Sequence, residues 1–273
     1  MINLNNYREN IYTSAGIRQS PCYGEDGVFK KIFELVGVSE KPLCIEFGEL
    51  RVLGTTSRQY RIQNISSAVY FSATMDFKSH LLNILDIFKV CIESRNLKFL
   101  RFFASLPKKK LITPENVLSH LEKKRKTSID LIVVDIDSFD LEVVEKMLIG
   151  QIAPKVFVVE YNPSLPYAEV LSFKYTHLTH DVKNKRFYGA SVGAWIKLFS
   201  KFNYDLIHIS GFCNLHFVKK EFSVLFQSPN IPDEITDTNE KVLKYVAEFC
   251  LPGFVPSWLD EPPLTSQELD LMR

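Results

Sequence analysis

Four oxygen-bearing side chains follow two apolar runs in the middle of the chain. One run ends in Asp135 and Asp137, and the next run ends in Glu160 and Asn162. If both runs are neighbouring strands of a parallel sheet, these side chains share the edge where open α/β sheets bind ligands. Crowded carboxylates repel one another unless a cation or a proton lies among them. The sequence therefore predicts a ligand-binding or catalytic site at this edge.

The residue types at this edge favour a hard divalent cation. The carboxylate and amide oxygens of these four side chains suit a hard divalent ion such as Mg²⁺, Ca²⁺ or Mn²⁺. Such an ion would hold a substrate hydroxyl and lower its pKa. The alternative is that Asp137 and Asp140 cap a helix that begins at about residue 139. We expect this capping role for Asp140.

The scaffold for these side chains is an alternation of apolar runs and helical patterns. The runs are rich in Val, Ile and Phe and apolar on both faces, as in strands of a sheet that is covered on both sides. The runs span 43–48, 68–73, 97–104, 130–137, 155–162 and 205–210. Helical patterns span 77–95, 113–126, 139–150 and 190–202. This alternation predicts a parallel, doubly wound α/β sheet.

The end of the alternation differs from its beginning. In residues 205–227, two apolar runs are separated only by GFCN, which leaves no room for a crossover helix. These runs should therefore pair antiparallel, as a hairpin. A seven-stranded, mostly parallel sheet closed by an antiparallel hairpin strand is the Rossmann-like methyltransferase fold. We expect residues 1–228 to form this domain.

The last segment, residues 229–273, has a different composition. It is rich in proline, includes an acidic stretch and one helical pattern at 240–250, and carries Phe254 and Trp258. These aromatic side chains would be exposed in a free tail. We therefore interpret the segment as an arm that packs on the domain or on a second subunit, which is a route to a homo-oligomer.

Composition excludes several classes of protein. Nearly half of the 273 residues are apolar and the net charge is +1, which indicates no nucleic-acid or membrane partner. No apolar run is long enough to span a bilayer, and the first residues lack the apolar segment of a signal peptide. The five cysteines are scattered, as is typical of reduced thiols. These features predict a cytoplasmic protein.

Six segments in order carry a resemblance to a known family. They are YGEDGVFKKIFELVG, CIEFG, DLIVVDIDSFD, VFVVEYNPSLP, YGASVGAW and CNLHFV, and they lie between about residues 19 and 228. Over this span the chain resembles the FkbM-type S-adenosylmethionine-dependent methyltransferases. The resemblance implies a Rossmann-like fold, S-adenosylmethionine as methyl donor, and a hydroxyl-bearing acceptor such as a sugar or another small metabolite.

The resemblance also implies roles for particular residues. The expected cofactor-binding residues lie at the ends of the first, second and fourth strands: Glu46, Gly48, Gly54, Ser72 and Asp135. Asp135 and Asp137 are the expected catalytic carboxylates. The resemblance further implies that a divalent ion, Mg²⁺ or Mn²⁺, would assist them, with Asp137, Glu160 and Asn162 as its ligands.

Two histidines are candidates for the general base. His177 and His180 lie in YTHLTHD, in the segment that usually closes over the acceptor site of a methyltransferase. A histidine there would take the proton of the acceptor hydroxyl, because its pKa lies near neutral pH. The alternative is that both are ordinary histidines of a surface loop.

A second functional hypothesis follows from the loop after the first strand. Glu49, Leu50 and Arg51 follow Gly48, where a cofactor needs open backbone, and Ser72 stands where a carboxylate normally binds the ribose. These departures favour a non-catalytic, methyltransferase-like domain that binds a partner or a carbohydrate within an assembly. An enzyme that uses the acidic edge with a different donor is a third possibility.

Overall fold

The structure is a computed structural model of the 273-residue chain. It describes residues 25–48, 56–57, 60–61, 64, 67–73, 76–98, 106, 108–122, 128–179, 184–210, 214–226 and 262–273.

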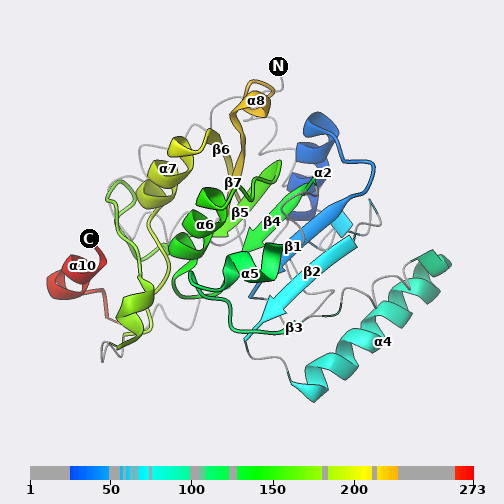
Figure 1. The fold of residues 1–273 in the computed structure, drawn as a ribbon, viewed down its shortest axis with the longest axis horizontal. Helices are drawn as coiled ribbons and strands as arrows, with labels where there is room; N and C mark the ends of the chain where they lie inside the picture. Colours follow the sequence, from blue (N-terminus) through cyan, green and yellow to red (C-terminus); the bar gives the residue numbers. More distant parts are fainter. Residues whose placement is uncertain are drawn as a thin grey trace.

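One seven-stranded sheet organises the molecule (Figure 1), with the strand order β3-β2-β1-β4-β5-β7-β6. The strands are β1 (Leu43–Phe47), β2 (Ser67–Ser72), β3 (Lys108–Lys109), β4 (Leu131–Val134), β5 (Val156–Glu160), β6 (Tyr204–Ser210) and β7 (Asn214–Lys219). Strands β1 to β5 pair parallel with one another, whereas β7 is antiparallel to both β5 and β6. The predicted mostly parallel α/β sheet with an antiparallel hairpin is therefore confirmed.

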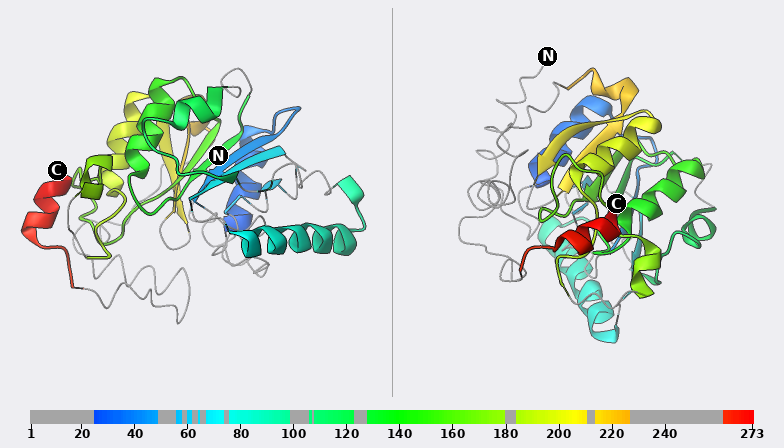
Figure 2. Two further views of the ribbon diagram at one scale, coloured as in Figure 1. Left: turned by 60° about the horizontal axis from the view of Figure 1, so that its bottom comes forward. Right: turned by 90° about the vertical axis from the view of Figure 1, so that its left-hand side faces the viewer.

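Helices cover both faces of the sheet (Figure 2). One face packs on α2 (Glu25–Val36), and the other packs on α5 (Val117–Leu121), α6 (Asp140–Ile149) and α7 (Val192–Lys201). Alternate strand residues divide between the two faces: Ile132 belongs to the α6 side, whereas Leu131 and Val133 belong to the α2 side. The central strands are buried on both sides, and their sequences are therefore continuous apolar runs.

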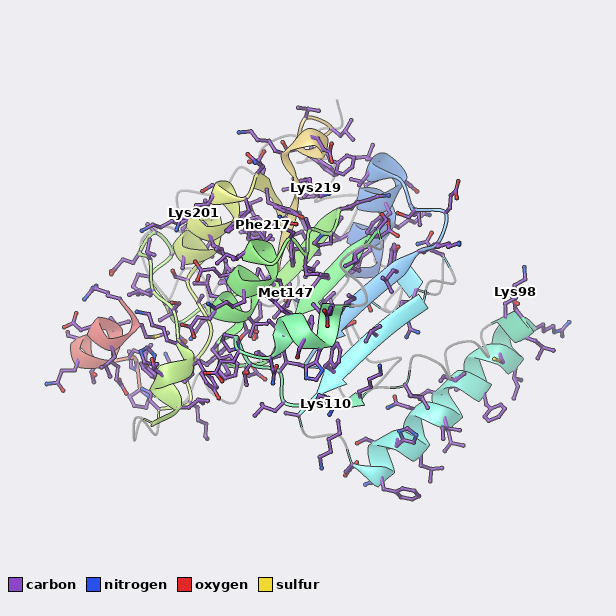
Figure 3. All side chains as sticks on the ribbon, in the orientation of Figure 1. Lys98, Lys110, Met147, Lys201, Phe217 and Lys219 are labelled. Atoms are coloured by element: carbon purple, nitrogen blue, oxygen red, sulfur yellow. The ribbon has the colours of Figure 1, made fainter. Side chains whose placement is uncertain are left out.

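The side chains fill the space between these layers (Figure 3). Met147 and Phe217 lie inside the core, whereas Lys98 and Lys110 lie at the periphery. None of the helices in the described part of the chain combines the length and the apolar character needed to cross a membrane.

The strand expected at 97–104 lies almost entirely outside the described residues, because 99–105 are not described. The edge strand that is described, β3, has two exposed lysines, and charged side chains at an edge discourage further pairing. The helix expected from Thr113 begins at Val117. The Asn116 side chain binds the backbone of Thr113 and Leu111, and this turn delays the helix.

Two further helices lie at the periphery. α4 (Phe77–Ser94) begins after Asp76, whose carboxylate accepts a hydrogen bond from the Ser79 amide, and ends at Arg95 in the left-handed region. α10 (Ser266–Met272) is the described part of the proline-rich segment. It packs on the domain, because the Met272 side chain is buried in the core and the Met272 carbonyl accepts a hydrogen bond from the Ser172 amide.

Candidate functional site

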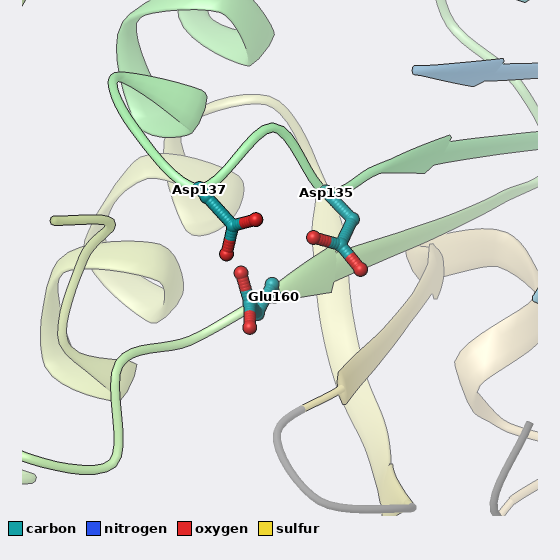
Figure 4. Close-up of side chains that lie close together, drawn as sticks. All are labelled: Asp135, Asp137 and Glu160. Carbon is teal, nitrogen blue, oxygen red and sulfur yellow. The ribbon is translucent and has the colours of Figure 1, made fainter. Parts of the chain in front are cut away.

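Three carboxylates converge at the carboxyl ends of β4 and β5 (Figure 4). Asp135 follows β4, Glu160 ends β5, and Asp137 lies two residues beyond Asp135. One oxygen of each carboxylate lies within 4.8 Å of the other two. The register Val134↔Val159 explains the pairing, because the next residues, Asp135 and Glu160, then lie side by side on one face of the sheet.

Asp137 joins the other two through an unusual turn. Its φ is +52°, in the left-handed region that residues other than glycine rarely adopt. The neighbouring Asp140 holds this turn: its buried carboxylate accepts hydrogen bonds from the amides of Ile136 at 2.8 Å and Ser138 at 3.0 Å. The expectation that the Asp140 side chain caps the helix is therefore wrong. The N-cap position of α6 is Phe139, and Asp140 binds the loop that precedes the helix.

The electrostatics of the cluster favour a positive charge or a proton among the carboxylates. Burial raises the pKa of Asp140 to about 6, although its two backbone hydrogen bonds act in the opposite direction. Desolvation raises the pKa of Asp137, while its side-chain interaction with Glu160 acts in the opposite direction. A cation would compensate the same negative charge without a proton.

Two residues from other elements, Trp195 and Asn214, lie next to Glu160. The indole Nε1 of Trp195 on α7 donates to the Glu160 carbonyl at 2.9 Å. Asn214 on β7 is the direct strand partner of Glu160, so its side chain lies on the same face of the sheet, next to the carboxylates. Sequence reasoning missed both residues. The antiparallel hairpin was the available signal for Asn214, but its register was not predictable.

The Asn162 side chain binds backbone groups of the chain itself. Its side chain is fully buried, and its amide nitrogen donates to the carbonyls of Arg186 at 2.7 Å and Tyr188 at 2.8 Å. Its Oδ1 accepts from the Ser164 amide at 2.8 Å. These bonds attach the 186–188 segment to the end of β5. The structure thus shows a positioning role for Asn162, and its role as a metal ligand stays a prediction.

Glu46 in β1 and Gly48 directly after it both have structural roles. Glu46 is buried, and its carboxylate accepts hydrogen bonds from the amides of Thr56 at 3.0 Å and Ser57 at 3.3 Å and from the Ser57 hydroxyl. Gly48 has a φ of +110°, and a Cβ there would overlap the carbonyl oxygen of Asp135. Glu46 therefore ties the 56–57 turn to β1, and Gly48 lets β1 end close to β4.

Ser72 lies at the end of β2, beside the end of β1. The register Phe47↔Phe71 makes it the neighbour of Gly48. Its side chain is only 2% exposed, and its hydroxyl has no hydrogen-bond partner within the described residues. A buried hydroxyl without a partner is unfavourable, so a polar ligand at this point would stabilise it. Gly54, the other expected cofactor contact, lies outside the described residues.

His177 lies in a short 3₁₀ helix, η3 (Tyr175–Thr179). Its ring is buried between Phe173 and Phe187, with centroid distances of 5.3 and 5.7 Å, and its Nδ1 accepts from the Lys174 amide at 3.0 Å. The alternative of an ordinary surface histidine is therefore wrong for His177, because aromatic neighbours enclose it. Its role as a base stays a prediction. His180 lies outside the described residues.

Comparison with models of known protein families gives no match for this chain. Comparison with the sequences of curated proteins gives no match either.

Proposed function

We propose that the chain is a divalent-cation-assisted O-methyltransferase that uses S-adenosylmethionine to methylate a hydroxyl of a sugar or another small metabolite. The observation that carries this proposal is the convergence of Asp135, Asp137 and Glu160 at the carboxyl ends of two neighbouring strands. Ligands of open α/β sheets bind at this edge.

The donor set fits a hard divalent cation. All three ligands are carboxylates, which Mg²⁺ and Mn²⁺ prefer over nitrogen or sulfur. Two of them stand on or directly after strands, and Asp140 holds the turn that presents the third. When bound, the cation would act as a Lewis acid toward the acceptor hydroxyl. The residues of the chain would orient that hydroxyl, and a neighbouring carboxylate would accept its proton.

The donor half of the proposed site lies at the ends of β1 and β2. Ser72 offers a buried hydroxyl at the end of β2, beside Gly48, and the ribose of S-adenosylmethionine carries hydroxyl groups that it would bind. Asp135 lies between this point and Glu160. A donor bound there would thus have its methyl group near a hydroxyl held at the carboxylates.

A specific observation favours a second candidate function. The Glu46 carboxylate, an expected cofactor ligand, is already occupied by Thr56 and Ser57. A chain with this arrangement would be a non-catalytic, methyltransferase-like domain that binds a partner or a carbohydrate. The two candidates differ in whether S-adenosylmethionine binds.

Calorimetric titration with Mn²⁺ and with S-adenosylmethionine tests both candidates. We expect wild type to bind Mn²⁺, and Glu160→Gln to bind it on the order of 100-fold more weakly, because one charged ligand is lost. The control is Glu115→Gln, an exposed carboxylate outside the cluster, which should leave Mn²⁺ affinity unchanged. Circular dichroism checks that both variants are folded.

The outcomes separate the parts of the proposal. Equal Mn²⁺ affinity of wild type and Glu160→Gln would overturn the cation site. Absence of S-adenosylmethionine binding at about millimolar concentration, with Mn²⁺ present, would overturn the methyltransferase and leave the non-catalytic candidate.

A further inference from the structure

Five large apolar side chains form an exposed stripe along α4, which lies apart from the other helices in Figure 1. The exposed fractions of the stripe residues are 83% for Phe77, 48% for Leu81, 55% for Leu85, 48% for Phe88 and 74% for Ile92. Their spacing of three or four residues places them on one side of the helix. Folded monomers rarely expose a continuous apolar patch of this extent.

The stripe is separate from the side by which α4 packs on its own chain. Asn83, Ile87 and Cys91 are buried, and they lie about 120° around the helix from the stripe at 100° per residue. The helix is therefore already anchored, and the stripe is a second apolar face. Each of its five side chains keeps about half or more of its surface exposed.

The order of residues along the stripe makes it self-complementary. If two copies of α4 pack antiparallel about a two-fold axis near Leu85, that residue faces its own copy. Leu81 then faces Phe88 of the other copy, and Phe77 faces Ile92. All five residues are matched by apolar partners, as an isologous interface requires.

The area is in the range that a dimer needs. A large apolar side chain has about 150–250 Å² of surface, so the exposed fractions correspond to about 500–600 Å² of apolar area per copy. A standard interface buries about 800 Å² per partner, including a polar rim. The stripe would therefore supply the apolar centre, and flanking residues of α4 would supply the rim.

The charges favour a second copy over a lipid surface. A membrane-binding helix usually has a polar face dominated by Lys and Arg. The polar residues of α4 are mixed, with Asp86 between Lys78 and Lys89. The net charge of the chain is only +1, so two copies repel each other little.

We propose that two copies of this chain form a homodimer through an antiparallel pairing of their α4 helices, with Leu85 at the two-fold axis. This interface is distinct from the proline-rich segment and does not depend on the proposed function. Its apolar centre is the stripe of Phe77, Leu81, Leu85, Phe88 and Ile92.

Analytical ultracentrifugation of the full chain tests the interface. We expect wild type to be a dimer, and Leu85→Glu to raise the dissociation constant by at least about 100-fold, because it places two carboxylates at the axis. The matched control is Ile149→Glu, at a position on α6 that is 59% exposed, which should dimerise like wild type. Leu85 is half exposed, so its replacement should leave the circular dichroism spectrum unchanged.

A pair of complementary variants tests the register. Leu81→Glu and Phe88→Lys should each be monomeric alone, because each places two unpaired charges against apolar partners. An equimolar mixture should form heterodimers, because the carboxylate introduced at position 81 then faces the ammonium introduced at position 88. A monomeric wild type at about 100 µM, a dimeric Leu85→Glu, or a mixture that stays monomeric would each overturn the proposal. Binding of a monomeric wild type to anionic vesicles would assign the stripe to lipid instead and would also overturn it.

Discussion

At the scale of single residues, burial sets the chemistry of several ionisable groups in this protein. His208 on β6 and His216 on β7 are direct strand partners, and their ring centroids lie 5.7 Å apart. Both side chains are buried, and Phe29 of α2 contacts the His216 ring edge-on at 5.4 Å. Burial lowers the pKa of His216 well below its ordinary value, and the neighbouring His208 lowers it further.

This pair makes stability depend on pH. In the unfolded chain His216 gains a proton near pH 6.5, whereas in the folded chain it stays neutral to a lower pH. Its contribution is therefore fully present above about pH 6.5 and is lost as the pH falls, by up to about 1.4 kcal/mol per pH unit. His216→Phe keeps a ring but cannot take the proton, so urea denaturation between about pH 7.5 and about pH 5.5 should show a smaller loss. An unchanged pH slope in the variant would contradict this assignment.

At the scale of elements, the end of β1 is constrained by its neighbour β4. Gly48 lies where β1 leaves the sheet, and its amide donates to the Phe71 carbonyl at 2.9 Å. The Asp135 amide donates to the Phe47 carbonyl at 3.1 Å. These bonds hold the ends of β1, β2 and β4 together, and they place Asp135 where it meets Glu160.

Two glycine substitutions separate steric overlap from backbone strain. Gly37 and Gly48 both have positive φ, but a Cβ at Gly37 would meet nothing within 4 Å, whereas a Cβ at Gly48 would overlap the Asp135 carbonyl. We expect Gly37→Ala to lower the free energy of unfolding by about 1–2 kcal/mol. Gly48→Ala should lower it by more than about 4 kcal/mol or prevent folding. Denaturant titration of both variants measures the difference, and equal losses would show that steric overlap at Gly48 is relieved.

At the scale of the whole molecule, the C-terminal helix is part of the domain. α10 begins with a capping box of Thr265 and Glu268, which defines its start. Arg273 forms an ion pair with Glu169 at 2.8 Å, but this pair is exposed and adds little stability. The buried Met272 side chain is therefore the main anchor.

A comparison of neighbouring residues tests this anchor. Met272 is 1% exposed, and Leu271 is 37% exposed. Met272→Ala should lower the free energy of unfolding by about 2–4 kcal/mol, because it leaves a cavity in the core. Leu271→Ala should change it by less than about 1 kcal/mol. Thermal denaturation of the two variants checks this contrast, and similar losses would show that α10 is not anchored through Met272.

Several features of the candidate site were predictable because they depend on local pattern. The apolar runs of β4 and β5 are continuous because both faces of these strands are covered. Asp135 and Glu160 lie at the ends of these runs, and the ends of parallel strands meet at one edge. Their placement at one edge of the sheet thus followed from the strand assignment, once the two strands were taken as neighbours. The antiparallel pairing of β6 and β7 followed from the short connection between them.

Other features depended on contacts that no local pattern encodes. The left-handed turn at Asp137 exists because the Asp140 carboxylate holds the amides on both sides of it. Asn162 and Glu46 have types suited to ligand binding, but the folded chain uses them to attach the 186–188 and 56–57 segments. The type of a polar side chain shows which hydrogen bonds it can form, but its partners depend on which segments the fold brings next to it.

The sequence by itself determined the α/β class, the mostly parallel sheet with its antiparallel hairpin, and the placing of acidic residues at the ends of two central strands. These follow from periodicity and connection length, which are local properties. Only the tertiary structure decided that Asp135, Asp137 and Glu160 come within 4.8 Å of one another, and that the apolar stripe of α4 faces outward. The physical reason is that distance and exposure depend on the packing of segments far apart in the chain.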